Sequence, residues 1–309
     1  MLAFPLIVLL LMLAACGGTS PAPSGGGNTG SAGARGPITV GGKLDTEAQL
    51  LTKMYSLLLS KAGFQVTEKA ALGNSNIVFQ AITSKQIDLY PEFTATGLNK
   101  LQIPSSYDPK KDYQTVKDEF DKRYQITWLD PSPLNDGYAL CTSKDESQKL
   151  GVTSLSQLAP KVGDLILVSP SDGVTFVDGL KKTYNIDTKS FKQVQTVNYG
   201  LSFTAISSGK AQIMVCYGTD IQVPAKNFIF LQDDKNGFPA FNPAPIVRND
   251  TLAKYPDIKN VLNPLAPKLT TEVSLALQKQ VQDKKQSGIS DKQAIKEVAT
   301  DFLKSQGLY

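Results

Sequence analysis

Histidine is absent from this 309-residue sequence, and its absence excludes several kinds of catalytic and metal-binding site. Ser-His-Asp and Cys-His catalysis, histidine acid–base chemistry and most zinc or iron sites all need it. The sequence also lacks the Gly-x-Ser-x-Gly, P-loop, His-Glu-x-x-His and Cys-x-x-Cys motifs, and no Gly-x-Gly-x-x-Gly follows a strand. We therefore predict a protein that is not an enzyme and that uses no cofactor or metal.

Cysteine is scarce: the chain has three. Cys141 and Cys216 are the two that follow the amino-terminal region, and two cysteines do not make a structural zinc site by themselves. They predict either a disulfide of an exported protein or two buried thiols, and their spacing does not decide between these.

An excess of charge of one sign is also missing. The 32 basic and 28 acidic residues nearly balance, and no basic block occurs. Nucleic-acid binding therefore has no support, and small neutral or zwitterionic partners fit better.

The amino terminus does carry a recognisable signal. Its apolar run, MLAFPLIVLLLMLAAC, is too short to span a bilayer as a mature helix, and it closes with small residues and Cys16. This ending resembles a bacterial lipobox, so we expect cleavage before Cys16 and acylation of that cysteine as an extracytoplasmic membrane anchor. The alternative is a cysteine that merely ends a signal helix. Residues 17–36 are rich in Gly, Ser, Pro and Ala and predict a flexible tether.

Strand and helix patterns alternate from residue 37 onward. Residues 37–42 read as a strand, and a helix follows in which Thr46 and Gln49 resemble a capping box. A second strand over 64–72, a helix after residues 73–76 and a third strand over 86–90 continue the alternation. This βαβαβ order predicts an α/β domain with a largely parallel sheet.

Residues 203–217, FTAISSGKAQIMVCY, echo residues 79–90, FQAITSKQIDLY. Each segment predicts a helix, a turn and a strand that ends in tyrosine, which indicates two lobes of similar construction. Tyr90 and Tyr217 would then lie at carboxyl ends of strands, where open α/β sheets bind ligands.

Proline-rich passages at residues 125–144 and 238–250 predict two crossings between the lobes. We expect lobe 1 to comprise residues 37–139 and 249–309 and lobe 2 to comprise residues 140–248. Two helices close the chain, one from about Thr271 and one capped by Ser290 with Gln293.

Tyrosines and small polar residues at predicted strand ends are the candidate ligand site. The rings of Tyr90, Tyr138, Tyr199 and Tyr217 can enclose a methylated ammonium by cation–π attraction, worth about 2 to 8 kcal/mol for three or four rings. The helix start at Asn74, Ser75 and Asn76 suits a carboxylate, because backbone N–H groups point outward there. Each of these residues is alternatively a packing or capping residue. Asp45 and Thr46 are predicted either to cap the first helix or to face the cleft, and Thr94 is predicted either to be a turn residue or to donate its hydroxyl to the ligand.

The motifs GGKLDTEAQLLTKMYSLLL, ALGNSNIVFQAI, IDLYPEFTATG, WLDPSPLNDGYAL and FNPAPIVR resemble, in order and spacing, those of the glycine betaine/carnitine/choline-binding lipoproteins of osmoprotectant ABC transporters. The resemblance covers nearly all of residues 38–309. It implies a two-lobed periplasmic-binding-protein fold of type II, hinged by the crossings, that closes on a quaternary amine and delivers it to a membrane permease. The resemblance also implies an extracytoplasmic protein. Because the sequence shows no sign of an oligomer, we expect a monomer.

Carried over residue by residue, the resemblance implies ligand contacts from Tyr90, Asn135, Tyr138 and Tyr217, with Pro91 and the threonines forming the turn after Tyr90. Phe203 stands where many members have tyrosine, and Tyr199 is the ring that would replace it. Two alternatives to a quaternary-amine receptor remain. One is the same fold with another small zwitterion, such as a polar amino acid, as ligand, and the other is an exported enzyme with Ser-Lys or carboxylate chemistry.

Overall fold

The computed structural model describes residues 35–171 and 173–309. The expected signal segment, the Cys16 anchor and residues 17–34 of the expected tether lie outside the described residues. Strand β1 begins at Arg35, so the last residues of the expected tether belong to the first strand.

The first sheet has the strand order β2-β1-β3-β10-β4. Strand β1 is parallel to β2 and β3, whereas β10 is antiparallel to β3 and β4. The bounds are β1 Arg35–Lys43, β2 Phe64–Gly73, β3 Leu89–Phe93, β4 Ile126–Trp128 and β10 Pro243–Arg248.

The second sheet repeats this plan with the order β7-β6-β8-β5-β9. Strand β6 is parallel to β7 and β8, and β5 is antiparallel to β8 and β9. The bounds are β5 Tyr138–Ser143, β6 Ile166–Ser169, β7 Gln193–Thr196, β8 Ile213–Tyr217 and β9 Phe228–Leu231.

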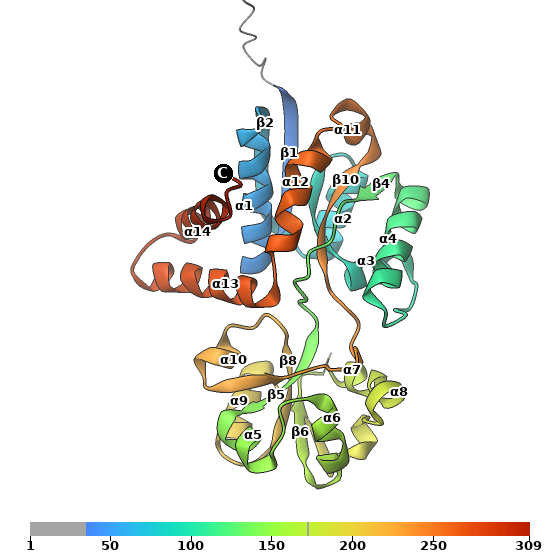
Figure 1. The fold of residues 1–309 in the computed structure, drawn as a ribbon, viewed down its shortest axis with the longest axis vertical. Helices are drawn as coiled ribbons and strands as arrows, with labels where there is room; N and C mark the ends of the chain where they lie inside the picture. Colours follow the sequence, from blue (N-terminus) through green and yellow to red (C-terminus); the bar gives the residue numbers. More distant parts are fainter. Residues whose placement is uncertain (1–34, 172) are drawn as a thin grey trace, which may run out of the picture. The chain divides into compact units, whose positions relative to one another are not determined.

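We call the part built on the first sheet lobe 1 and the part built on the second sheet lobe 2. Crossing segment 1, residues 129–137, leads from β4 into β5, and crossing segment 2, residues 232–242, leads from β9 into β10 (Figure 1). The expected lobe boundaries differ from this division, because residues 243–248 form β10 in the sheet of lobe 1 and β5 of lobe 2 already begins at Tyr138.

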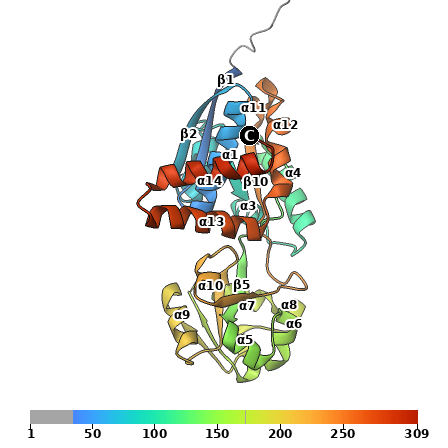
Figure 2. The ribbon, with the colours of Figure 1, turned by 60° about the vertical axis from the view of Figure 1, so that its left-hand side comes forward.

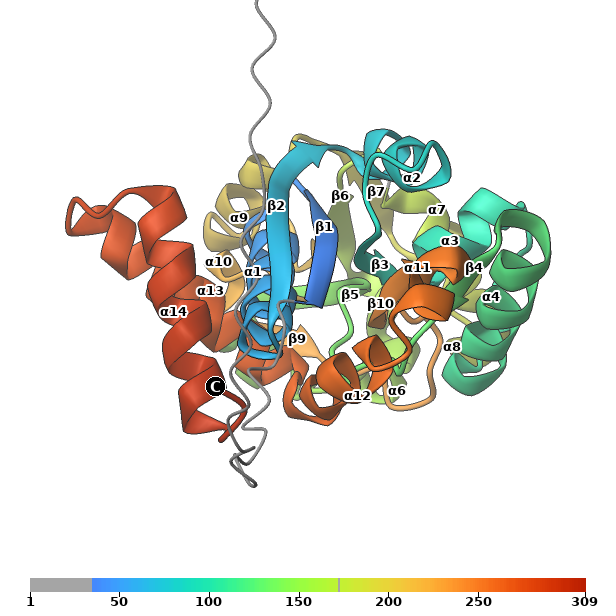
Figure 3. The same ribbon diagram turned by 90° about the horizontal axis from the view of Figure 1, so that it is seen from above.

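Lobe 1 carries most of the long helices. Helix α1 packs on β2 and on α14, and α13 packs on α14, so these three helices lie together (Figures 2 and 3). The predicted last two helices are confirmed, including the Ser290 cap that accepts from the backbone N–H of Gln293. The bounds are α1 Thr46–Lys61, α2 Ser75–Thr83, α3 Thr94–Leu101, α4 Pro109–Tyr124, α11 Asn249–Lys254, α12 Ile258–Leu262, a 3-10 turn Asn263–Lys268, α13 Thr271–Gln286 and α14 Asp291–Ser305.

Lobe 2 is built with shorter helices around a separate core that includes Leu140, Leu167, Ile213 and Val215, all fully buried. Its helices are α5 Lys144–Leu150, α6 Leu155–Leu158, α7 Val174–Gly179, α8 Lys181–Tyr184, α9 Tyr199–Ser207 and α10 Gln222–Ala225, with 3-10 turns at Ala159–Asp164 and Thr188–Ser190.

The echo between the two halves corresponds to equivalent places in the two sheets. Helix α2 leads into β3, and α9 leads into β8; each of these strands lies third in its sheet, beside the strand that a crossing segment enters. The α/β fold with two lobes of similar construction is thus confirmed. The two strands differ in length beyond their tyrosines, since β8 ends at Tyr217 and β3 continues to Phe93.

Cys141 and Cys216 form a disulfide, which settles the alternative left open by their spacing. It joins neighbouring strands β5 and β8, and both cysteines are fully buried. The bond therefore fixes the two strands that carry Tyr138 and Tyr217.

Candidate binding site

Five aromatic rings meet where crossing segments 1 and 2 join lobe 2. Tyr138 starts β5, and its ring stacks on Phe176 of α7 with centroids 3.9 Å apart. Tyr217, at the end of β8, lies 5.4 Å from Tyr138 and 4.9 Å from Tyr199, the first residue of α9. Phe241 of crossing segment 2 meets Tyr138 edge-on at 6.4 Å. We call these five residues the ring cluster; each of them is half-buried.

A cavity of about 220 Å³ adjoins the ring cluster. Its walls come from α3 and the following loop of lobe 1, from α7 of lobe 2 and from crossing segment 2. The lining residues are Ala95, Leu98, Asn99, Ser105, Tyr107, Thr175, Phe176, Pro239 and Phe241. None of these side chains carries a formal charge, so the cavity is a neutral space with two cluster rings on its wall.

Tyr199 is held in the ring cluster by a carboxylate. Its hydroxyl donates to Asp220 Oδ2 at 2.5 Å, and Asp220 Oδ1 accepts from the backbone N–H of Gln222 at 2.8 Å. Burial and then the hydrogen bond to Asp220 raise the pKa of the Tyr199 hydroxyl, so it remains protonated. The Tyr199 ring also meets the Phe203 ring edge-on, with centroids 5.6 Å apart. Of these two neighbouring rings, Tyr199 is the one that contacts Tyr217.

Hydrogen bonds tie the two crossing segments together beside the ring cluster. The Asn135 side chain accepts from the N–H of Phe241 at 2.8 Å, and the N–H of Asp136 donates to the carbonyl of Phe241 at 3.2 Å. At the start of α3, the Thr94 hydroxyl donates to the carbonyl of Ala240 at 2.7 Å. Asn135 and Thr94 therefore act on crossing segment 2, and through it they place Phe241.

Tyr90 does not lie at the site that the sequence predicted for it. It is the second residue of β3 and is fully buried in the core of lobe 1, and its hydroxyl donates to Glu92 Oε2 at 2.7 Å. The expected turn after it is also wrong: Pro91 and Glu92 continue the strand, and Thr94 begins α3. The ring of Tyr90 thus supports the sheet and has no exposed face.

The residues expected to hold a carboxylate, Asn74–Asn76, and those expected to cap the first helix or face the cleft, Asp45 and Thr46, lie at helix starts at the carboxyl edge of the sheet of lobe 1. Asp45, and not Thr46, is the N-cap of α1, since its side chain accepts from the N–H of Ala48 at 2.7 Å. Asn74 caps α2 by accepting from the N–H groups of Asn76 and Ile77. No described cavity includes Asp45, Asn74, Ser75 or Asn76, and Thr46 lines a separate hollow with Gln278.

Sequence reasoning missed a buried ion pair at the same edge. Lys43 Nζ lies 2.5 Å from Glu92 Oε1 and 4.6 Å from the centroid of the Phe93 ring. Glu92 is fully buried and Lys43 is 6% exposed. The missed rings of the site are Phe176 and Phe241; Phe241 stands in the FNPAPIVR motif, whereas no motif marked Phe176.

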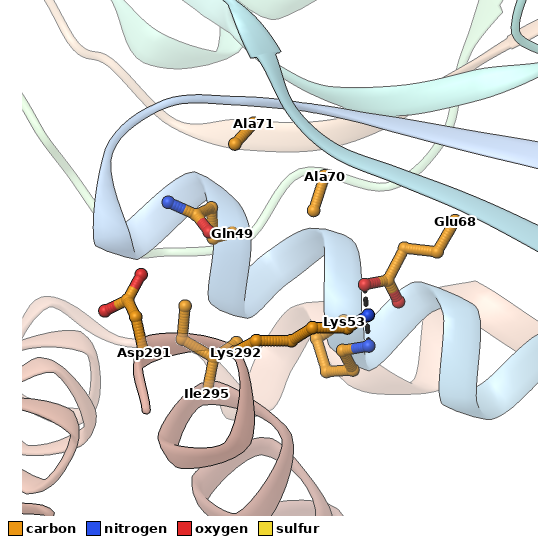
Figure 4. A pocket seen from close by; sticks show the side chains of 8 residues that line it. All are labelled: Gln49, Lys53, Glu68, Ala70, Ala71, Asp291, Lys292 and Ile295. Atoms are coloured by element: carbon orange, nitrogen blue, oxygen red, sulfur yellow. Dashed lines mark ion pairs between the residues drawn. The ribbon is translucent and has the colours of Figure 1, made fainter. Parts of the chain in front are cut away.

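A second hollow, of about 460 Å³, lies on lobe 1 between α1, β2 and α14 (Figure 4). An ion pair between Lys53 and Glu68, 2.6 Å long, crosses one side of it, and no aromatic ring lines it. Its chemistry therefore differs from that of the ring cluster.

No group of three or more acidic, cysteine or histidine side chains is placed to hold a metal ion in residues 35–171 and 173–309. Within the same ranges, every helix is too short or too polar to cross a bilayer.

Two α/β lobes joined by two crossing segments, with a ring-lined cavity beside the crossings, define a two-lobed solute-binding protein. The family described as "Substrate binding domain of ABC-type glycine betaine transport system" matches residues 36–305. The chain belongs to this family, and the resemblance seen in its motifs is confirmed. It is a substrate-binding component for transport and not an enzyme, and it acts outside the cytoplasm.

Individual relatives agree with this assignment. The chain is 28% identical over 283 residues to a glycine-betaine-binding protein of Pseudomonas aeruginosa, covering 88% of each chain. It is equally similar, at 28% over 277 residues, to the ergothioneine transport permease/ergothioneine binding protein EgtU of Helicobacter pylori; this match covers 88% of the chain and only 48% of that longer protein. The solved structure of apo YehZ from Escherichia coli superimposes with a TM-score of 0.74 at 26% identity, covering 88% of this chain and 99% of YehZ.

Proposed function

We propose that this protein captures a quaternary amine of the glycine betaine type in the cavity beside the ring cluster and delivers it to an ABC permease. The observation that carries the proposal is the meeting of five rings from α7, α9, β5, β8 and crossing segment 2, two of which, Phe176 and Phe241, line a neutral cavity. A methylated ammonium donates no conventional hydrogen bond, so ring faces are the groups that bind it best.

Ring contacts supply part of the binding free energy. Each ring contributes about 0.5 to 2 kcal/mol, and the three rings that line the cavity, Tyr107, Phe176 and Phe241, give about 1.5 to 6 kcal/mol. Micromolar affinity needs about 8 kcal/mol. The remainder must come from burial of the methyl groups and from polar groups such as Asn99, Ser105 and Thr175, which line the same cavity.

The names of the relatives support a quaternary amine as the class of ligand, and they differ in the particular compound. Glycine betaine and ergothioneine, the compounds in the names of two relatives, both carry a trimethylammonium group and a carboxylate. A small zwitterion without methyl groups, such as a polar amino acid, is the second candidate, because a neutral cavity with amide and hydroxyl groups also accommodates it. We further propose that acylated Cys16 anchors the protein to the membrane, as the lipobox and tether indicate, and that the protein works as a monomer.

Isothermal titration of the purified protein with glycine betaine, choline, carnitine, ergothioneine and glutamine tests the proposal. We expect saturable binding of at least one trimethylammonium compound and none of glutamine. Binding of glutamine alone would move the protein to the amino-acid alternative, and silence with all five compounds would overturn the proposed ligand class.

Two variants locate the site. Phe176→Ala and Phe241→Ala each remove a cavity-lining ring, and each should weaken binding by about 3- to 30-fold, which corresponds to about 0.7 to 2 kcal/mol. Tyr309→Ala is the matched control, because that ring is 40% exposed at the end of the chain and lines none of the described cavities. Unchanged affinity in both phenylalanine variants would contradict the proposed location.

A further inference from the structure

Two carboxyl groups that the proposed site does not use lie close together at the hinge. Glu47 belongs to the first turn of α1 in lobe 1, and Asp136 belongs to crossing segment 1. Glu47 is 4% exposed, and one of its oxygens, Oε1, has no hydrogen-bond partner. Asp136 is half-buried. Negative charge on both groups is therefore costly, because neither is fully hydrated and each repels the other.

Neutral side chains connect this acid pair to lobe 2. Thr219, two residues beyond Tyr217 of the ring cluster, donates to Asp136 Oδ1. Gln278 of α13 donates to the carbonyl of Thr219 at 3.2 Å and lies 3.4 Å from Glu47 Oε2, which also accepts from Ser274 at 2.5 Å. Thr219 of lobe 2 thus contacts Asp136 directly and is connected to Glu47 through Gln278 of α13.

We propose that Glu47 and Asp136 are a proton-controlled latch at the hinge: a proton on the pair holds Thr219 of lobe 2 against lobe 1, and loss of that proton releases it. The charged groups that act on the pair are few. Asp45, before α1, adds a further negative charge, and Lys43, at the end of β1, opposes it while paired with Glu92. The facing residues of α13 and of the loop after β8 are Ser274, Gln278 and Thr219, which are neutral.

The electrostatics set the pH range. Burial raises the pKa of Asp136 to about 6, and burial together with the charge of Asp136 raises the pKa of Glu47 well above its usual value. Because both pKa values are raised in the folded state, the latch is complete at low pH and is lost as pH rises through them. With no histidine in the chain, the range from pH 5 to 8 is set by Asp136, whose pKa of about 6 lies within it.

The size of the effect follows from Asp136 alone. If release returns its pKa from about 6 to the ordinary 3.8, the ratio of latched to released molecules falls about 10-fold between pH 5 and pH 8. Nothing in the effect depends on which ligand the protein binds.

Nuclear magnetic resonance of the purified protein without ligand tests the latch. The readout is the Overhauser contact between the Thr219 methyl group and the Gln278 side-chain amide, followed from pH 5 to pH 8. We expect it to weaken with rising pH in the wild type and to become independent of pH in Asp136→Asn, whereas Glu47→Gln, which keeps Asp136, should retain a transition. Glu68→Gln is the matched control, since that carboxylate pairs with Lys53 away from the hinge, and it should titrate like the wild type.

Thr219→Val keeps both carboxyl groups and removes the lobe 2 donor, so the valine methyl contact to Gln278 should be weak at every pH. This variant tests the latch even where an acid-pair variant does not fold. A wild-type contact unchanged from pH 5 to 8, or a transition that persists in Asp136→Asn, would overturn the proposal. Since no quaternary amine is present, neither result depends on the proposed ligand.

Discussion

Replacing both cysteines of the Cys141–Cys216 disulfide with alanine should destabilise lobe 2 strongly. The two residues are separated by 75 positions, and closing a loop of that length removes entropy from the unfolded chain worth about 4.5 kcal/mol at 25 °C. Both cysteines are fully buried, so loss of sulfur contacts adds to this cost. An isolated lobe of this size has a urea m-value of about 1.5 kcal/mol/M, and the unfolding midpoint of lobe 2 should therefore fall by about 3 M.

Urea unfolding followed by two probes measures this effect lobe by lobe. Trp128 is the single tryptophan of the chain and lies in the core of lobe 1, so its fluorescence reports that lobe, whereas far-ultraviolet circular dichroism reports both. We expect the double variant to show an early dichroism step before the tryptophan transition. Wild-type protein reduced while unfolded is the control and should behave in the same way. A midpoint shift below about 0.5 M would refute the loop-entropy reasoning.

Two predictions concern the free energy of unfolding of lobe 1, measured in urea. One tests the ion pair at the carboxyl edge of the sheet, and the other tests the helix packing. Glu92→Gln leaves the buried Lys43 ammonium without its counter-ion and should cost about 3 to 5 kcal/mol, whereas the double variant Lys43→Met/Glu92→Gln should cost less; equal losses would contradict the pairing. Gly97→Ala places a methyl group 2.7 Å from Trp128 and should cost about 1 to 3 kcal/mol, whereas Gly200→Ala, which meets nothing within 4 Å, should not. Comparable losses in the two glycine variants would contradict the close packing at Trp128.

Local sequence signals predicted the elements whose own residues determine them. The Ser290 cap and the apolar face of α14 are both contained in one short segment, so the pattern was sufficient there. The cap of α1 shows the limit of such signals. Asp45 and Thr46 are both good capping residues, and the choice between them depends on where the chain leaves β1, which tertiary pairing decides.

Tyr90 was misplaced because proline normally marks the end of a strand. In β3, Pro91 faces Pro245 of the neighbouring strand β10, and the carbonyl of Pro245 points away to accept from the N–H of Leu129. Two prolines opposite each other at such a position leave no donor unpaired between them. The strand can therefore continue to Phe93, and this compensation is invisible in a single segment.

The ring cluster could be predicted only in part, for a related reason. Tyr138 and Tyr217 are opposite one another in the β5–β8 ladder. Both lie at ends of strands, so the strand pattern of the sequence was sufficient to predict them as site residues. Phe176 lies on a helix of 6 residues with no distinctive pattern, and Phe241 reaches the cluster because Asn135 fixes crossing segment 2. The two rings of the cluster that line the cavity are thus the ones that no local pattern marks. The hinge that brings those segments together also carries the acid pair, so a change of pH at the hinge would act on the position of the ring cluster.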